Sequence, residues 1–256
     1  MNAFIIGKFH YQQIMRNRSI ITIIVILSLL SIIGIAFRFG IQNFIPLPGT
    51  DHLLFTFSMW NAGALIYCIF YAAGLFDQQL QQRYFTATIS RPIYFWEFQL
   101  GHFLSIYYVF LSMSLLSIII MTFKALVYES AFPDHFVLIL FDKWIGAASF
   151  IMIVLSIGFV FRKTSTIAIF FIVAILASIF STVGDPPHPF LKVMKYILYI
   201  ITPVERTMEI TDETTLMNYD FLYHQLENIS MLLYAGTLMI LSNLYYTKKD
   251  YPLRGQ

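Results

Sequence analysis

Six long apolar stretches, separated by polar segments, dominate this sequence of 256 residues. A helix needs about 20 consecutive apolar residues to cross the roughly 30 Å hydrocarbon core of a membrane. Each of the six stretches meets or nearly meets that length, and none contains an acidic or basic residue. We therefore predict an all-α membrane protein with six transmembrane helices, over residues 19–37, 53–76, 103–123, 144–161, 164–183 and 229–246.

The composition agrees with a membrane protein. Apolar residues make up 58% of the chain and charged residues 12%, whereas soluble domains average about 25% charged residues. The net charge of +2 is too small to indicate a nucleic-acid partner. The single cysteine, Cys68, excludes an internal disulfide and any paired-cysteine metal or redox motif. No polar stretch is long enough for a separate soluble domain, so residues 1–256 are predicted to form one transmembrane domain.

The basic residues determine the expected orientation, because cytoplasmic loops are enriched in lysine and arginine. With the N-terminus in the cytoplasm, the inner segments carry ten of these residues and the outer segments six. Both termini are therefore expected inside. The fourth span is expected to begin at Trp144. A start near His135 is the alternative, but it would put Asp142 and Lys143 inside the span, so these two are placed at its outer boundary instead.

Two segments outside the spans are predicted to lie on the membrane surface. The first 17 residues are expected to form an N-terminal interfacial helix. In the long loop between the fifth and sixth spans, residues 191–201 read LKVMKYILYII. These residues have one apolar helical face but are too few to span, which indicates an outer interfacial helix.

Polar and small residues within the spans leave two interpretations open. The amides of Asn61 and Asn243 could form interhelical hydrogen bonds or line a substrate path. Small residues recur every fourth position in two spans, where helix backbones can approach closely. Such a face could pack within one subunit or against a second copy, mainly for the fifth span. The two sets are Ala64, Cys68 and Ala72 in the second span, and Ala174, Ser178 and Thr182 in the fifth.

Motifs that would indicate catalysis are missing from the sequence. It contains no P-loop, no HExxH and no GxSxG. Four histidines are expected on the outer side, three with an acid nearby, and such groups can bind copper or zinc. Their spacing matches no known ligand motif, so solvated loop residues are the preferred interpretation and no metal site is predicted. These histidines are His52, His135, His188 and His224.

The segment between the second and third spans, from Asp77 to about His102, is longer than a turn requires. Proline disfavours helical conformation in the residue before it, so Pro92 predicts that a short helix ends near Ser90. A second helix is expected to start after Pro92 and to continue into the third span. Its aromatic residues could serve as a membrane anchor. The segment could also be a docking surface for a cytoplasmic partner.

Residues 81–103 read QQRYFTATISRPIYFWEFQLGHF. This pattern resembles the segment between the second and third spans of type 2 ABC exporter permeases. In that family a leucine- or isoleucine-rich helix ends in Ser-Arg-Pro, followed by an aromatic-Glu pair and Gly-Lys-Phe. The resemblance is greatest to the permeases linked with gliding motility and with maturation of nitrous oxide reductase. Three other stretches support it: VLSIGFVFRKTSTIAIF, YIITPVERTMEI and LYYTKKDYPL.

The resemblance implies a permease in the bacterial inner membrane that exports a substrate by alternating access. A separate ATPase subunit, in two copies, would hold ATP and Mg²⁺, so this chain would carry no cofactor and no catalytic residue. A second permease copy or a paralogue and the membrane lipids would be its other partners. The short helix ending at Ser90 would be the coupling helix on the ATPase. The residues expected to make this contact are Arg83, Thr88, Ser90, Arg91 and Pro92, with Glu97 at its edge.

The sequence departs from the family pattern at two places. Gly-Lys-Phe is replaced by Gly-His-Phe at residues 101–103, and Phe95 stands where an arginine often occurs. Both changes lower the basic charge of the inner face. Two other functions remain as alternatives: a non-transporting scaffold or assembly subunit of a multiprotein complex, and a membrane-embedded enzyme. Intramembrane acids, histidine clusters and catalytic motifs would favour the enzyme, and the sequence shows none.

Overall fold

The computed structural model describes residues 2–41, 51–81, 95–128, 131–133, 136–182, 189, 192–193 and 221–248. Within these residues every regular element is helical, which confirms the predicted all-α class. The helices are α1 (Asn2–Met15), α2 (Arg18–Ile41), α3 (Asp51–Gln81), α5 (Phe95–Tyr128), α6 (Phe136–Val160), α7 (Lys163–Thr182) and α11 (Phe221–Lys248).

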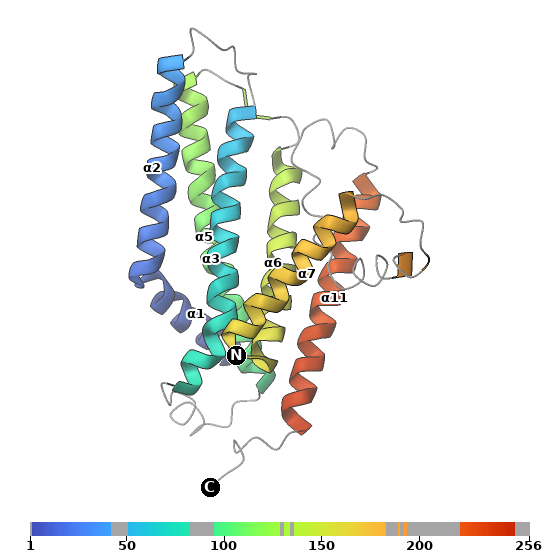
Figure 1. Ribbon diagram of the computed structural model, residues 1–256. Coiled ribbons are helices and arrows are strands. Elements are labelled where there is room, and N and C mark those ends of the chain that lie inside the picture. The colour runs from blue at the N-terminus through green and yellow to red at the C-terminus, as the bar shows by residue number, and fades with distance from the viewer. Residues whose placement is uncertain are drawn as a thin grey trace.

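The long helices form an elongated bundle (Figure 1). Helices α3, α5 and α6 pack against one another at its centre, α11 packs on α6, and α2 lies along α3. Helix α1 is short and crosses the bundle at one end, where α3 ends and α5 begins (Figure 1). We call this the α1 end of the bundle.

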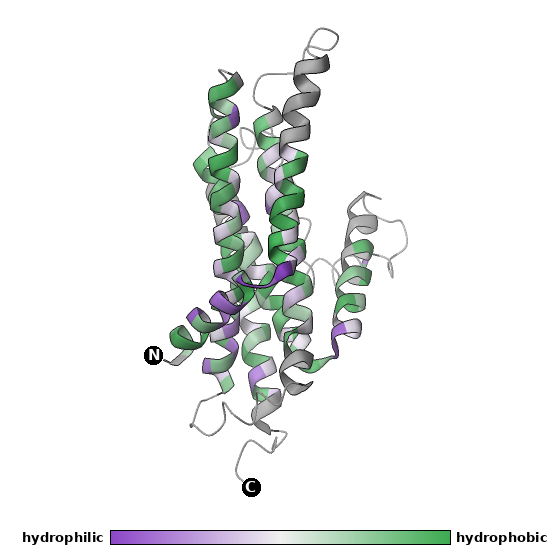
Figure 2. Ribbon diagram, turned by 90° about the vertical axis from the view of Figure 1, so that its left-hand side faces the viewer, coloured by the Kyte–Doolittle hydropathy of each residue, from purple (hydrophilic) through white to green (hydrophobic). Residues whose placement is uncertain are grey.

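Among the described residues, three helices are long and apolar enough to cross a membrane: Leu53–Leu75 of α3, Phe95–Val127 of α5 and Phe136–Val160 of α6. A fourth span arises if α1 and α2, which meet at a bend of 62°, are counted together. Apolar colour covers most of the helices in Figure 2, and hydrophilic colour gathers around α1 and the bend. Each of the six predicted spans coincides with a helix, and three or four of these helices qualify as spans.

The bend between α1 and α2 has a local cause in the sequence. Asn17 occupies the position before α2, and its Oδ1 accepts hydrogen bonds at 3.1 Å from the backbone N–H and from the hydroxyl of Ser19. A side-chain oxygen at this position satisfies a backbone donor that the first helical turn leaves unpaired. Asn17 therefore starts a new helix instead of continuing α1. The predicted N-terminal helix is confirmed as a helix of its own.

The fourth span was expected to start at Trp144. This is wrong for the helix that contains it, which starts earlier. Helix α6 begins at Phe136, whose backbone N–H donates to the carbonyl oxygen of Pro133 at 3.3 Å. Asp142 and Lys143 therefore lie inside the helix, and Asp142 is only 1% exposed. The prediction treated a charge as a helix boundary, whereas packing of α6 against α3 and α5 removes Asp142 from solvent.

The second helix expected after Pro92 is confirmed, since α5 begins at Phe95 and continues to Tyr128. The short helix expected before Ser90 and most of the outer interfacial helix lie outside the described residues.

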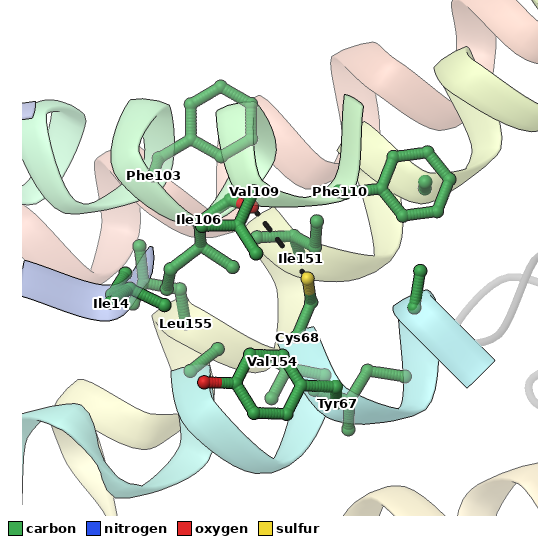
Figure 3. Close-up of a cluster of buried hydrophobic side chains, with 14 of the residues drawn as sticks. Ile14, Tyr67, Cys68, Phe103, Ile106, Val109, Phe110, Ile151, Val154 and Leu155 are labelled. Carbon is green, nitrogen blue, oxygen red and sulfur yellow. Dashed lines mark hydrogen bonds between the residues drawn. The ribbon is translucent and has the colours of Figure 1, made fainter. Parts of the chain in front are cut away.

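The core lies where α3, α5 and α6 meet, with Ile14 contributed by α1 (Figure 3). Ala64, Cys68 and Ala72 of α3 are each at most 1% exposed within it. The Cys68 thiol donates to the carbonyl oxygen of Ile106 on α5 at 3.7 Å, which shows how closely these helices approach. A Cβ atom on Gly158 of α6 would lie 3.2 Å from the carbonyl oxygen of Ala72. The small residues of α3 therefore serve packing within the chain.

Candidate functional site

The residues predicted to contact an ATPase fall mainly in the segment 82–94, between α3 and α5. Arg83, Thr88, Ser90, Arg91 and Pro92 lie outside the described residues. Glu97 is described, and it is buried in the first turn of α5 with 8% exposure. The structure thus describes the two helices that border the segment, and the role of its residues stays a prediction.

The first turns of α5 are covered by α1 through a contact between glycines. A Cβ atom on Gly101 would lie 2.8 Å from Cγ2 of Ile6 and 2.9 Å from the carbonyl oxygen of Ala3. A Cβ atom on Gly7 would lie 3.2 Å from the carbonyl oxygen of Gly101. Only residues without a side chain allow the two backbones to approach this closely. We call the contact between α1 and residues 98–112 of α5 the α1–α5 junction.

Two histidines meet at this junction, a contact that no pattern in the sequence predicted. The ring centroids of His10 and His102 lie 4.3 Å apart, and His102 is fully buried. Phe98 contacts His102 edge to face at the same centroid distance of 4.3 Å. Burial lowers the pKa of the His10 imidazole, while a hydrogen bond with Gln13 acts in the opposite direction. The histidine that departs from the family pattern thus packs inside the chain.

Polar bonds extend the junction to neighbouring elements. The Tyr11 hydroxyl of α1 lies 2.9 Å from the Ser112 hydroxyl of α5. The Gln99 amide donates to the Ser242 hydroxyl of α11, and both residues are buried. Helices α1, α5 and α11 are therefore connected at the end of the bundle that borders the segment 82–94.

A second close contact at this end joins α3 to the first residue of α7. The methylene groups of Lys163 pack over Gly74, where a Cβ atom would lie 2.9 Å from Cδ of Lys163. Phe95 of α5 packs against Phe159 of α6 with 5.5 Å between ring centroids. The end of α3, the start of α5 and the α6–α7 turn thus lie near one another.

The structure tests some of the predictions for polar and small residues within the spans and leaves others untested. The Asn61 amide donates to the carbonyl oxygen of Phe57 at 2.8 Å and to the Ser117 hydroxyl of α5 at 3.5 Å. An interhelical bond by Asn61 is thereby confirmed. Asn243 is half-buried beside Ser242. The side chains of Ala174, Ser178 and Thr182 lie outside the described residues, so a dimer face on α7 stays a prediction.

No group of histidine, cysteine and acidic residues in the described part of the chain could hold a metal ion. The four outer-side histidines were predicted to be loop residues, and this is wrong for two of them, since His52 lies in α3 and His224 in α11. The side chains of all four, including His135 and His188, lie outside the described residues.

Comparisons with protein-family models, with curated proteins and with solved structures find no match for this chain.

Proposed function

We propose that this chain is the membrane-spanning permease subunit of an ATP-binding-cassette exporter in a bacterial inner membrane. In this proposal the chain crosses the membrane six times with both termini in the cytoplasm, and α1 lies on the inner surface. The α1 end of the bundle then faces the cytoplasm. The proposal rests on the motif at residues 81–103 and on the way the bundle borders that motif.

The structural observation that supports the proposal is the continuity of the helices on both sides of the segment 82–94. Helix α3 continues beyond its apolar span to Gln81, and α5 runs without interruption from Phe95 to Tyr128. Both helices belong to the central core, where the Cys68 thiol bonds to the Ile106 carbonyl oxygen. A displacement of the segment would therefore move α3 and α5 together as a rigid body, as alternating access requires.

In this mechanism the partner ATPase holds ATP and Mg²⁺ and supplies the energy. Arg83, Thr88, Ser90 and Arg91 would contact its surface, and Pro92 would separate the coupling helix from α5. Glu97 is buried, so it would act by holding the first turn of α5 in place. Two ATPase subunits and a second permease copy or paralogue would complete the transporter.

The test is co-purification of an ATPase from the native host, followed by replacement of the predicted contact. Ser90, Arg91 and Pro92 are changed together to alanine. Arg162→Ala with Ser165→Ala, two exposed positions at the α6–α7 turn, is the matched control. The triple variant is expected to lose the ATPase and the control to keep it. Equal ATPase recovery with both variants would refute the coupling-helix assignment, and the absence of any ATPase would favour the scaffold function.

A further inference from the structure

Lys124 is a buried cation near the C-terminal end of α5. That end of α5 lies opposite α1 in the bundle (Figure 1). Lys124 lies four positions before the last residue of α5, Tyr128, and it is 6% exposed. Its Nζ donates a hydrogen bond to Oγ1 of Thr56 on α3 at 2.7 Å, and Thr56 is itself 2% exposed. A hydroxyl from a neighbouring helix thus fixes the position of the ammonium group.

The described residues leave the charge of this ammonium group uncompensated. It carries three N–H donors, and Thr56 is the one acceptor that the described part of the chain provides. Asp142 is a buried carboxylate on α6, but its electrostatic partner is the adjacent Lys143. A buried cation without an anion is strongly unfavourable, and ionisable groups within membrane proteins are usually paired.

The surroundings of Lys124 and Thr56 are apolar. Residues from three helices form a buried hydrophobic cluster next to them: Leu53, Leu54 and Phe57 of α3, Met121 and Ala125 of α5, and Ile139 of α6. Lys124 also lies near the end of the apolar span Phe95–Val127, where we expect lipid headgroups to meet the hydrocarbon core. A ligand with an anionic group and an apolar body matches both properties, whereas a free inorganic anion matches only the charge.

We propose that Lys124 and Thr56 form a binding site for the phosphate group of an anionic membrane amphiphile. Phosphate oxygens would accept hydrogen bonds from the remaining N–H groups of Lys124. The acyl chains would lie against exposed apolar side chains that neighbour the site in the sequence, Phe55 of α3 and Phe123 and Leu126 of α5. The ammonium group of lysine forms strong, charge-assisted hydrogen bonds with phosphate oxygens. The site is independent of the ATPase proposal, because it lies at the other end of the bundle and requires no nucleotide.

The experiment measures the thermal unfolding midpoint, Tm, of the purified full chain in a neutral detergent. Three additives are compared: short-chain phosphatidylglycerol, short-chain phosphatidylcholine and inorganic phosphate. Phosphatidylglycerol is expected to raise Tm by at least about 5 °C when present at about 100 times its Kd. The other two additives are expected to leave Tm unchanged. An equal effect of inorganic phosphate would show a small-anion site and would overturn the proposal.

Variants test whether the rise in Tm caused by phosphatidylglycerol depends on Lys124. Lys124→Met is expected to abolish the response to phosphatidylglycerol, and Lys124→Arg to retain it. Lys8→Met is the control, because Lys8 is an exposed lysine on α1, at the other end of the bundle. Retention of the response by Lys124→Met would overturn the proposal. If that variant does not fold, Thr56→Val is used, and an undiminished response in it would be equally decisive. A wild-type protein whose Tm does not respond to phosphatidylglycerol would also overturn the proposal.

Discussion

Gly7 and Gly101 face each other where α1 crosses α5, so that a Cβ atom on Gly7 would lie 3.2 Å from the Gly101 carbonyl oxygen. This contact brings α1 against the first turns of the helix that follows the predicted coupling segment. A displacement of that segment would therefore also displace α1, in addition to α3 and α5. The α1–α5 junction thus lies next to the segment on which the proposed function rests.

Substitution of Gly101 by alanine is expected to destabilise the protein. The new methyl group would meet the Ala3 carbonyl oxygen at 2.9 Å, and backbone atoms cannot rotate away as a flexible side chain can. Overpacking of this kind costs about 1–3 kcal/mol, so Tm measured in detergent should fall by several degrees.

The control for this substitution is Gly236→Ala in α11. A Cβ atom at Gly236 would meet no atom within 4 Å. Alanine is also the better helix former by about 1 kcal/mol, so Tm should stay the same or rise. An equal loss of stability in both variants would contradict the close contact at Gly101.

Acidification is expected to loosen α1. The pKa of His10 is lowered from its ordinary 6.5 by burial, so the free imidazole binds a proton more readily than the docked one. The contribution of docked His10 to the free energy of unfolding is therefore fully present above pH 6.5 and is lost as the pH falls below that value. Hydrogen exchange of α1 should accelerate on acidification in the wild type and much less in His10→Gln. The same acceleration in both proteins would assign the effect to other groups.

Removal of the Ser31 hydroxyl is expected to destabilise the contact between α2 and α3. The Trp60 indole N–H donates to Ser31 Oγ at 2.8 Å, and Trp60 is fully buried. Ser31→Ala leaves that donor unsatisfied, which costs about 1–3 kcal/mol. Ser28→Ala is the matched control one turn earlier on α2, because no hydrogen bond of the Ser28 side chain occurs among the described residues. The difference in Tm between the two variants measures the bond.

Cys68 is expected to resist alkylation in the folded protein. It is fully buried in the core and it is the one cysteine of the chain. Thiols react as thiolates, which an apolar environment disfavours. Maleimide labelling should therefore be slow in mild detergent and rapid after denaturation, with no labelling of Cys68→Ala. Rapid labelling under native conditions would show that α3 separates from α5 and α6.

The sequence was informative where one property decided the local structure. Apolar runs without charges correctly located the helices, because the backbone in an apolar medium must satisfy its own hydrogen bonds. Pro92 correctly indicated a new helix, which begins at Phe95. The start of α6 was misplaced, because charge was used as the criterion and Asp142 is buried by neighbouring helices.

The sequence by itself determined the all-helical class and the helix that follows Pro92, since helix formation and apolar length are local properties. Only the tertiary structure decided that His10 meets His102, that Gly7 meets Gly101 and that Lys124 reaches Thr56. Each pair joins helices far apart in the chain, and similar apolar helices could pack in many registers. Close approach of backbones at small residues, together with the pairing of buried polar groups, distinguishes one register from the others.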